Sequence, residues 1–314
     1  MVKSGMDSKK IAQCHGVLVL NKPKGPSSTS CIERIKRKFK QKKIGHAGTL
    51  DPMASGVLVV LLGKATKLAP YLMEGHKVYR GVIRLGIETD TYDITGNVLK
   101  ESSYLGLTED EIVKAVYEWQ NIKEQEVPPY SAAKYKGKTF YSMARQGERP
   151  PKRVKKIYID QVEVLGVNLP FIEFRIRCSK GTYVRSLAHS LGKRLKVGGV
   201  LFSLIRERAE PYGLEHSVSM EELLNSPSLF FEKVIDLSES LPHWPKLAVD
   251  EDISNKIKNG NLIRVGEIGG AYPEKEGERY LFLDPSLRAL AIMETRFIDG
   301  TLYWKILRGL WGRE

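Results

Sequence analysis

The chain has 314 residues, of which 42% are hydrophobic and 28% are charged. These fractions are typical of a folded globular protein and exclude an intrinsically disordered chain, and the length favours about two domains. The longest strictly apolar run, residues 57–62, is far too short to cross a bilayer. We find no secretory signal pattern near the start, so we expect a cytoplasmic protein without a membrane interaction. The spacing of the three cysteines predicts neither a disulfide framework nor a zinc site.

The formal net charge is +13, and it is concentrated in two segments. Residues 33–43 carry a net charge of +6 and residues 134–156 carry +8, so the remainder of the chain sums to −1. A single charged run is often only a solvated surface, but two runs that hold the whole excess favour a polyanionic partner. The second run also carries aromatic residues that could stack on unpaired bases, which favours RNA or DNA; these are Tyr130, Tyr135, Phe140 and Tyr141.

The first elements in chain order are a strand and an amphipathic helix. Residues 17–20 are all apolar and predict a buried strand, and residues 21–26 are rich in proline and glycine and predict a turn. The next apolar residues recur at helical spacing, which places the first basic run on the outside of a helix; they are Ile32, Ile35 and Phe39. Residues 79–87 alternate and predict a strand whose inner face carries Tyr79, Gly81, Ile83, Leu85 and Ile87.

The middle of the chain continues this mixture. Thr108 and Glu111 have the spacing of a capping box and predict the start of a helix that runs through Trp119. Apolar residues alternate with charged ones over residues 172–178, which predicts a strand, and a further helix follows from Val184. Because no regular strand–helix–strand repeat is present, we predict an α+β fold with a mixed, largely antiparallel sheet.

The sequence pattern changes near Trp244, after which short apolar runs alternate with turn residues. Asp299-Gly300 lies between two of these runs and predicts a hairpin. We therefore predict a small β-rich domain over residues 245–314, a larger domain over residues 1–240, and a connector within residues 225–245.

One glycine-rich loop holds the first candidate for chemistry. Residues 45–56 contain three glycines, His46 and a single carboxylate, Asp51, which precedes a proline. Taken alone, an aspartate in that position is most often a turn residue, and a lone histidine is most often structural. The chain lacks a complete phosphate loop, a zinc-protease helix, a nucleophile elbow and a dinucleotide fingerprint, so we expect side-chain chemistry without a metal or cofactor.

Five motifs follow one another in order along the chain. They are Asn21-Lys22-Pro23-Lys24-Gly25, residues 45–56, Val78-Tyr79-Arg80 with residues 85–91, Tyr130-Ser131-Ala132-x-Lys134, and residues 178–185. Together they resemble the TruB family of tRNA pseudouridine synthases, from about residue 16 to about residue 215. Residues 245–314 resemble, more loosely, a PUA domain, which is an RNA-binding β-barrel-like module.

The resemblance implies a pseudouridine synthase fold and a cofactor-independent isomerase that converts uridine to pseudouridine at position 55 in the tRNA T loop. It implies that Asp51 is the nucleophile, attacking either the sugar C1′ or the base C6, that Arg185 pairs with it, and that Tyr79 packs on the base and carries the C5 proton. Tyr183 and Leu204 match residues that line the pocket for a base flipped out of the RNA.

The remaining implied contacts concern the RNA. His46 matches a histidine that contacts the RNA and helps to hold the flipped loop. Lys22 lies in the family's first motif, which is expected to pack behind Tyr79 rather than to take part in the chemistry, and it is counted among the residues expected to bind the substrate RNA. Residues 124–156 match an insertion that closes over the T arm, so Lys134, Lys152 and Arg153 are expected to bind RNA. This agrees with the charge and aromatic pattern of the segment.

The resemblance implies a monomer that acts on the T arm of tRNA without an obligatory protein partner, because the chain keeps the long insertion of the stand-alone branch. Two alternatives stay open at this stage. One is a tRNA-folding chaperone without catalytic activity, and the other is a guide-dependent synthase that works inside a ribonucleoprotein.

Overall fold

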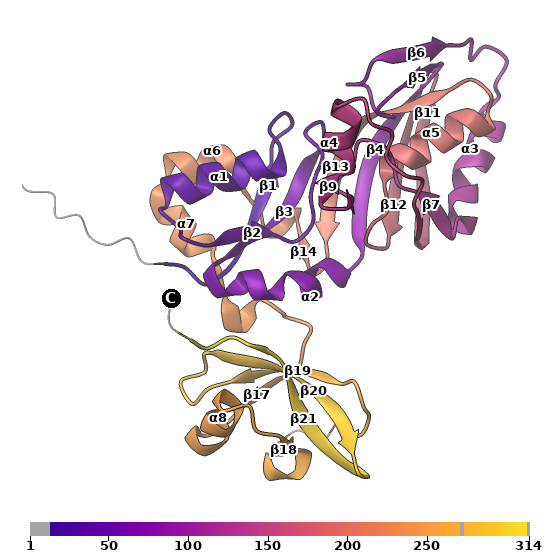
Figure 1. Ribbon diagram of the computed structural model, residues 1–314. Coiled ribbons are helices and arrows are strands. Elements are labelled where there is room, and N and C mark those ends of the chain that lie inside the picture. The colour runs from indigo at the N-terminus through magenta and orange to yellow at the C-terminus, as the bar shows by residue number, and fades with distance from the viewer. Residues whose placement is uncertain (1–12, 271–272, 313–314) are drawn as a thin grey trace, which may run out of the picture.

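Figure 1 shows the computed structural model, which describes residues 13–270 and 273–312. Most of the chain forms one large sheet with helices packed against it, and the last part forms a separate five-stranded sheet below α2 in this view. Within the described ranges, no helix has both the length and the apolar character needed to cross a membrane.

The large sheet has the main strand order β11-β12-β4-β13-β3-β1-β15. Neighbouring strands are antiparallel except for the pairs β13–β3 and β1–β15, which confirms the predicted mixed, largely antiparallel sheet. The strands are β1 (Gly16–Lys22), β3 (Ser55–Leu62), β4 (Lys77–Leu85), β11 (Ile159–Asn168), β12 (Phe171–Cys178), β13 (Gly199–Ala209) and β15 (Val218–Ser219), with β2 (Ile44–His46), β14 (Tyr212–Gly213) and β16 (Ile235–Asp236) paired beside them.

Three two-stranded sheets and seven α-helices complete this part of the described chain. The small sheets pair β5 (Ile87–Thr89) with β6 (Val98–Glu101), β7 (Glu124–Glu126) with β10 (Val154–Lys156), and β8 (Lys134–Tyr135) with β9 (Lys138–Thr139). The helices are α1 (Ser28–Lys38), α2 (Ala69–Glu74), α3 (Glu109–Tyr117), α4 (Phe140–Arg145), α5 (Val184–Arg194), α6 (Met220–Asn225) and α7 (Pro227–Lys233).

The strands β1 and β3 are continuous apolar runs because both of their faces are covered. Leu18 and Leu58 pack on the side of α1, α6 and α7, whereas Val17 and Val57 belong to a cluster on the opposite side. A strand buried on both faces has no polar alternation. The first predicted strand and the helix that follows it are thus confirmed.

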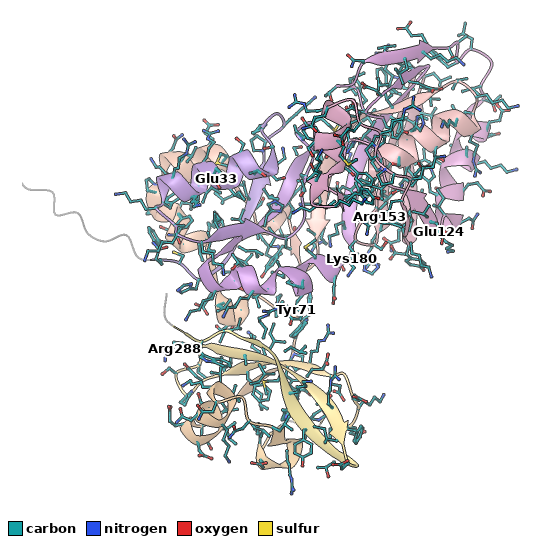
Figure 2. The ribbon with its side chains drawn as sticks, in the orientation of Figure 1. Glu33, Tyr71, Glu124, Arg153, Lys180 and Arg288 are labelled. Atoms are coloured by element: carbon teal, nitrogen blue, oxygen red, sulfur yellow. The ribbon has the colours of Figure 1, made fainter. Side chains whose placement is uncertain are left out.

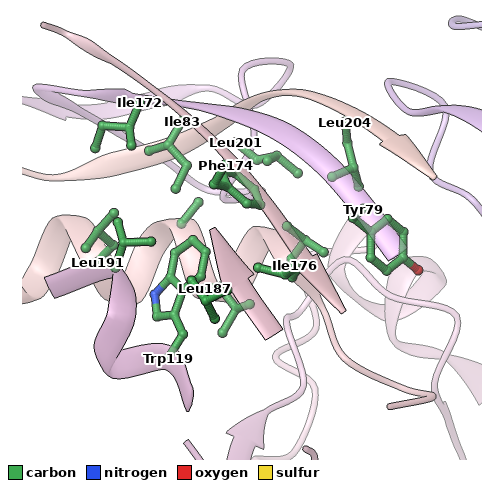
Figure 3. Packing of buried hydrophobic residues seen from close by; sticks show 14 of the residues in the cluster. Tyr79, Ile83, Trp119, Ile172, Phe174, Ile176, Leu187, Leu191, Leu201 and Leu204 are labelled. Carbon is green, nitrogen blue, oxygen red and sulfur yellow. The ribbon is translucent and has the colours of Figure 1, made fainter. Parts of the chain in front are cut away.

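The other half of the sheet alternates, as the sequence predicted for β4 and β12. Ile83 and Phe174 point to a core under α3 and α5, and Figure 3 shows Trp119 and Leu187 in the same cluster. The predicted strand over residues 79–87 is divided, because Gly86 has a φ of 86° and separates β4 from β5.

Two predicted elements differ from the structure in their limits. The capping box of Thr108 and Glu111 is present, but α3 ends at Tyr117, and Trp119 lies in the short 3-10 helix that follows. The expected connector over residues 225–245 instead contains α7 and β16. The reason is Phe230, which is fully buried and stacks on Phe39 with ring centroids 4.0 Å apart.

The second sheet consists of β17 (Lys246–Ala248), β18 (Ile263–Arg264), β19 (Arg279–Leu283), β20 (Ala289–Ile298) and β21 (Thr301–Gly309), and α8 (Glu251–Lys258) packs on it. Asp299 and Gly300 both have positive φ and form the predicted hairpin turn. The sequence interpretation missed α8. The domain limits 1–240 and 245–314 stay a prediction.

The second sheet is joined to the large one by apolar packing through α2. Leu281 and Leu310 share a buried cluster with Leu72. The guanidinium of Arg279 lies 5.9 Å from the ring centre of Tyr71, which faces the second sheet in Figure 2. A shared apolar cluster of this kind holds the two sheets in a defined relative position.

Candidate active site

The aspartate loop, residues 45–56, enters β3 where the two halves of the large sheet meet. There β3 and β13 form only a short parallel pairing, in which Arg206 lies opposite Gly56. Gly56 has a φ of 101°, and a Cβ at this position would lie 2.3 Å from the Arg206 carbonyl oxygen. Only glycine fits so close an approach, and it allows the loop to turn away from the sheet.

Asp51 and Arg185 form the central ion pair of this region. Arg185 lies in the first turn of α5, and its Nε donates a hydrogen bond of 2.8 Å to Oδ2 of Asp51. The Arg185 side chain is 5% exposed, whereas that of Asp51 is 38% exposed. The guanidinium is therefore fixed inside the protein, while the carboxylate stays open to an incoming molecule.

The other guanidinium nitrogens of Arg185 are also bonded. Nη1 donates to the carbonyl of Thr91 and Nη2 to that of Tyr130, both at 2.9 Å. The carboxylate of Asp93 lies 3.8 Å from Nε and adds a second negative charge. Because Arg185 is held from three segments, it can orient Asp51 with little freedom of its own.

The two side chains border a pocket of about 230 Å³. The pocket brings together five residues that the sequence interpretation assigned to the site: Asp51, Tyr79, Tyr183, Arg185 and Leu204. Its other walls come from the aspartate loop, from Ser131 and Ala132, from residues 179–182, and from Met73, Lys77, Val184 and Arg206. Segments distant in the sequence thus form one concave site with both apolar and charged walls.

Tyr79 lies between the apolar core and the pocket. Its side chain sits at the margin of the core cluster in Figure 3, with the hydroxyl directed away from the other labelled side chains. Burial raises the pKa of Tyr79, and the nearby Arg206 guanidinium opposes that rise. Burial likewise raises the pKa of Tyr183, so both phenols remain protonated at neutral pH.

One lysine that was not assigned to the site, Lys77, lines the pocket, and another, Lys155, lies beside it. Lys77 is 5% exposed, donates to the carbonyls of Met73 and Gly75, and has its pKa lowered to about 8, mainly by burial. The ammonium of Lys155 lies 5.6 Å from the ring centre of Tyr183. Lys155 therefore links the second basic run directly to the pocket wall.

Lys22 and His46 lie outside the pocket lining. Lys22 is fully buried and donates to the carbonyls of Pro23 and Pro26, at 2.9 and 2.8 Å. Burial lowers its pKa. His46 lies in β2, where burial also lowers its pKa and its Nδ1 has no hydrogen-bond partner. Contacts of these two residues with RNA stay predictions, and the bonds present show Lys22 bracing the turn after β1.

The second basic run lies beside the pocket, where Lys134, Lys152 and Arg153 are exposed. Arg153 can be located in Figure 2. Tyr135 and Tyr141 are also exposed, but Phe140 is buried at 1% and cannot stack on a base as its position in the sequence suggested. Phe140 begins α4 and anchors that helix. RNA binding by this run stays a prediction.

Sequence reasoning missed Asp93 and Arg206. Asp93 lies two residues after the motif over residues 85–91. Its proximity to Arg185 of α5 arises only in the folded chain. Arg206 lies two positions beyond Leu204 in a strand, a spacing that directs both side chains to the same face. A charged residue on the inner face of an otherwise apolar strand was the available signal.

The site combines an exposed carboxylate, a fixed guanidinium and flat apolar walls. A carboxylate held in this way can attack an electrophilic carbon of a heterocyclic or sugar ring. In the described ranges, no group of three or more His, Cys, Asp or Glu side chains is placed to hold a metal ion.

Comparison with known proteins gives the chain its family. A family model described as "TruB family pseudouridylate synthase (N terminal domain)" matches residues 36–184. Two relatives are named tRNA pseudouridine synthase B. The one from Oleidesulfovibrio alaskensis is 49% identical, and the match covers 98% of this chain and 99% of the relative. The one from Thermotoga maritima is 36% identical, and the match covers 89% of this chain and 90% of the relative.

A similar fold occurs in a solved structure titled "Crystal Structure of a Cbf5-Nop10-Gar1 Complex". The TM-score is 0.72 at 23% sequence identity, and the match covers 95% of this chain and 85% of the other. The likeness concerns the fold, which supports the predicted pseudouridine synthase architecture and a PUA-like second sheet. By its identity to close relatives over nearly its whole length, the chain belongs to the TruB family of tRNA pseudouridine synthases, which are isomerases.

Proposed function

We propose that this chain converts the T-loop uridine conventionally numbered 55 of tRNA into pseudouridine, with Asp51 as the nucleophile. The observation that carries the proposal is the Asp51–Arg185 pair at the rim of the pocket. The buried guanidinium places a positive charge 2.8 Å from the attacking carboxylate and fixes its direction.

The reaction leaves the composition of the nucleoside unchanged. The bond between the sugar C1′ and N1 breaks, a bond between C1′ and C5 forms, the C5 proton leaves, and N1 gains a proton. Asp51 forms a transient covalent bond with either C1′ or C6, and release of the product regenerates the carboxylate. Tyr79 is the proposed carrier of the C5 proton, because it lines the same pocket as Asp51. Its phenol is protonated, so it gives its own proton toward N1 and takes up the C5 proton in exchange, which leaves Tyr79 unchanged at the end of the reaction.

The base must leave its stack to meet Asp51, which costs a few kcal/mol. The rings of Tyr79 and Tyr183 and the side chain of Leu204 offset this cost by packing on the base, since all three line the pocket.

Positive charge also gathers at two places outside the pocket, which suits a folded RNA. The second basic run borders one side through Lys155. A separate cleft of about 230 Å³ lies toward the second sheet and is lined by Trp311 and four lysines, namely Lys42, Lys43, Lys64 and Lys67. Burial and the neighbouring cations lower the pKa of Lys67, which indicates a closely packed positive region. A polyanion relieves such repulsion.

The test incubates the purified protein alone with an unmodified tRNA transcript and maps pseudouridine in the product. We expect modification at position 55 by the wild type, with none by Asp51→Asn at unchanged tRNA affinity. Refolding of tRNA without any pseudouridine would identify a chaperone. Product formed only after a guide RNA and partner proteins are added would identify a guide-dependent enzyme.

This proposal describes a monomer that needs no protein partner and meets its tRNA in the cytoplasm. The same incubation checks that no protein partner is needed, and sedimentation of the active protein checks that it is a monomer.

A further inference from the structure

Arg206 is one of the most deeply buried charged residues of the chain. It lies in β13, is 1% exposed, and still borders the active-site pocket. Its Nε donates to the carbonyl of Val57 at 2.7 Å, and its two terminal nitrogens donate to Gly48 at 3.0 Å and Thr49 at 3.4 Å. The carbonyls of Gly48 and Thr49 belong to the aspartate loop, and that of Val57 lies near the start of β3.

These bonds hold the loop on both sides of Asp51. Gly48 and Thr49 precede the aspartate, and Val57 follows it. The backbone of Arg206 adds a further restraint, because it lies opposite Gly56 in the β3–β13 pairing. One residue therefore fixes the entry and the exit of the segment that carries the nucleophile.

The guanidinium also acts on the pocket itself. Arg206 lies opposite Tyr79 in the antiparallel pairing of β4 with β13, and it interacts with the Tyr79 phenol. Burying a cation costs much desolvation free energy, whereas neutral hydrogen-bond donors could hold the loop with a smaller cost. What the charge adds is positive potential at the pocket wall, between the aspartate loop and Tyr79.

We propose that Arg206 is a positioning residue for the reaction, which sets the place of Asp51 through the loop carbonyls and orients the Tyr79 hydroxyl. The proposal rests on the proposed function and adds to it a residue that acts through the aspartate loop and Tyr79. The planar shape of the Arg206 guanidinium matters for this role. A lysine would keep the positive charge, but its single ammonium could not donate to the same three carbonyls in this arrangement.

The experiment compares Arg206→Lys and Arg206→Ala with the wild type under single-turnover conditions at saturating enzyme. A misplacement of about 1 Å costs about 100-fold in rate, and we expect a loss of that order for Arg206→Lys with tRNA affinity changed by less than about threefold. Guanidinium ion in the tens of millimolar is expected to raise the Arg206→Ala rate at least tenfold. Arg208→Lys is the matched control, because Arg208 lies in the same strand but bonds to Pro211 and Glu215.

Hydrogen exchange separates positioning from a general loss of structure. We expect the Ala54 amide, bonded to the Asp51 carbonyl at 3.1 Å, to exchange faster in Arg206→Lys while the amides of β4 are unchanged. A wild-type rate in Arg206→Lys overturns the proposal. So does faster exchange throughout β4 and β13 without rescue by guanidinium. Absence of product with the wild type would instead remove the proposed function.

Discussion

The guanidinium of Arg185 donates through Nε to the carboxylate of Asp51 at 2.8 Å, although the two residues are 134 positions apart in the chain. The bond joins a loop before β3 to the first turn of α5, and the remaining guanidinium nitrogens are held by Thr91 and Tyr130. The nucleophile is therefore oriented by a group that is itself bonded on every side. The direction of the Asp51 carboxylate therefore depends on the planar geometry of the Arg185 guanidinium.

Arg185→Lys is expected to lower the single-turnover rate by about 100-fold or more, because an ammonium cannot bond to Asp51, Thr91 and Tyr130 in the same arrangement. Rapid-quench measurement of pseudouridine in a tRNA transcript checks this, with Arg194→Lys as the control at the exposed end of the same helix. Equal rates for the two variants would contradict the role of the fork.

The second basic run is expected to supply affinity rather than chemistry. Replacing Lys152, Arg153 and Lys156 together by alanine should weaken tRNA binding and reduce the slope of log affinity against log salt by about 2 to 3, since each phosphate contact contributes about 0.7 to 0.9. Filter binding between low and physiological salt measures the slope, and the single-turnover rate at saturating RNA should remain.

Lys155 is kept in this variant because its ammonium lies over the ring of Tyr183, which lines the pocket. The matched control replaces three exposed lysines on other elements, Lys100, Lys114 and Lys233. An equal loss in both triple variants would mean that overall charge, and not this surface, governs binding.

Lys77 predicts a dependence of stability on pH. Its pKa in the folded protein is about 8, below the ordinary value of 10.5, so the unfolded chain binds more protons between these two values. Stability carried by this residue therefore rises as the pH increases through that interval, by at most about 3 kcal/mol. Below pH 8 both states are protonated and the cost of burying the ammonium is complete.

Thermal melting of the wild type and Lys77→Met from pH 7.5 to 10.5 isolates this effect. The wild type should gain relative to the variant as the pH rises, while Lys100→Met, altered on an exposed strand, should follow the wild type. A constant difference between the wild type and Lys77→Met over the interval would show that the Lys77 pKa is not depressed.

Gly56→Ala tests the junction between β3 and β13. The added Cβ would meet the Arg206 carbonyl oxygen at 2.3 Å, and the residue would also keep a φ of 101°. We expect a loss of more than about 3 kcal/mol in the free energy of unfolding, from the clash and the backbone strain together. Denaturant titration measures it.

Gly137→Ala is the control, because Gly137 has a φ of 84° but no atom within 4 Å of its added Cβ. It should lose about 1 kcal/mol from backbone strain alone. Similar losses for both substitutions would contradict the close approach of the two strands.

The elements that could be predicted from the chain are those with local causes. The apolar spacing of Ile32 and Ile35 produces α1, the alternation of residues 172–178 produces β12, and Thr108 with Glu111 starts α3. Predictions were wrong where a distant partner decided the outcome. Phe230 packs α7 onto the core within the expected connector. Gly86, whose amide donates to the carbonyl of Gly198, divides a strand although the apolar alternation continues through it.

For the site, the amino-acid sequence by itself determined which side chains were available and which family motifs carried them, including Asp51, Tyr79 and Arg185. Only the tertiary structure decided that Arg206 and Lys77 are buried charges at the same pocket and that Asp93 lies near Arg185. The physical reason is that the cost and the effect of a charge depend on the groups around it. Those groups come from strands and loops that meet only after folding.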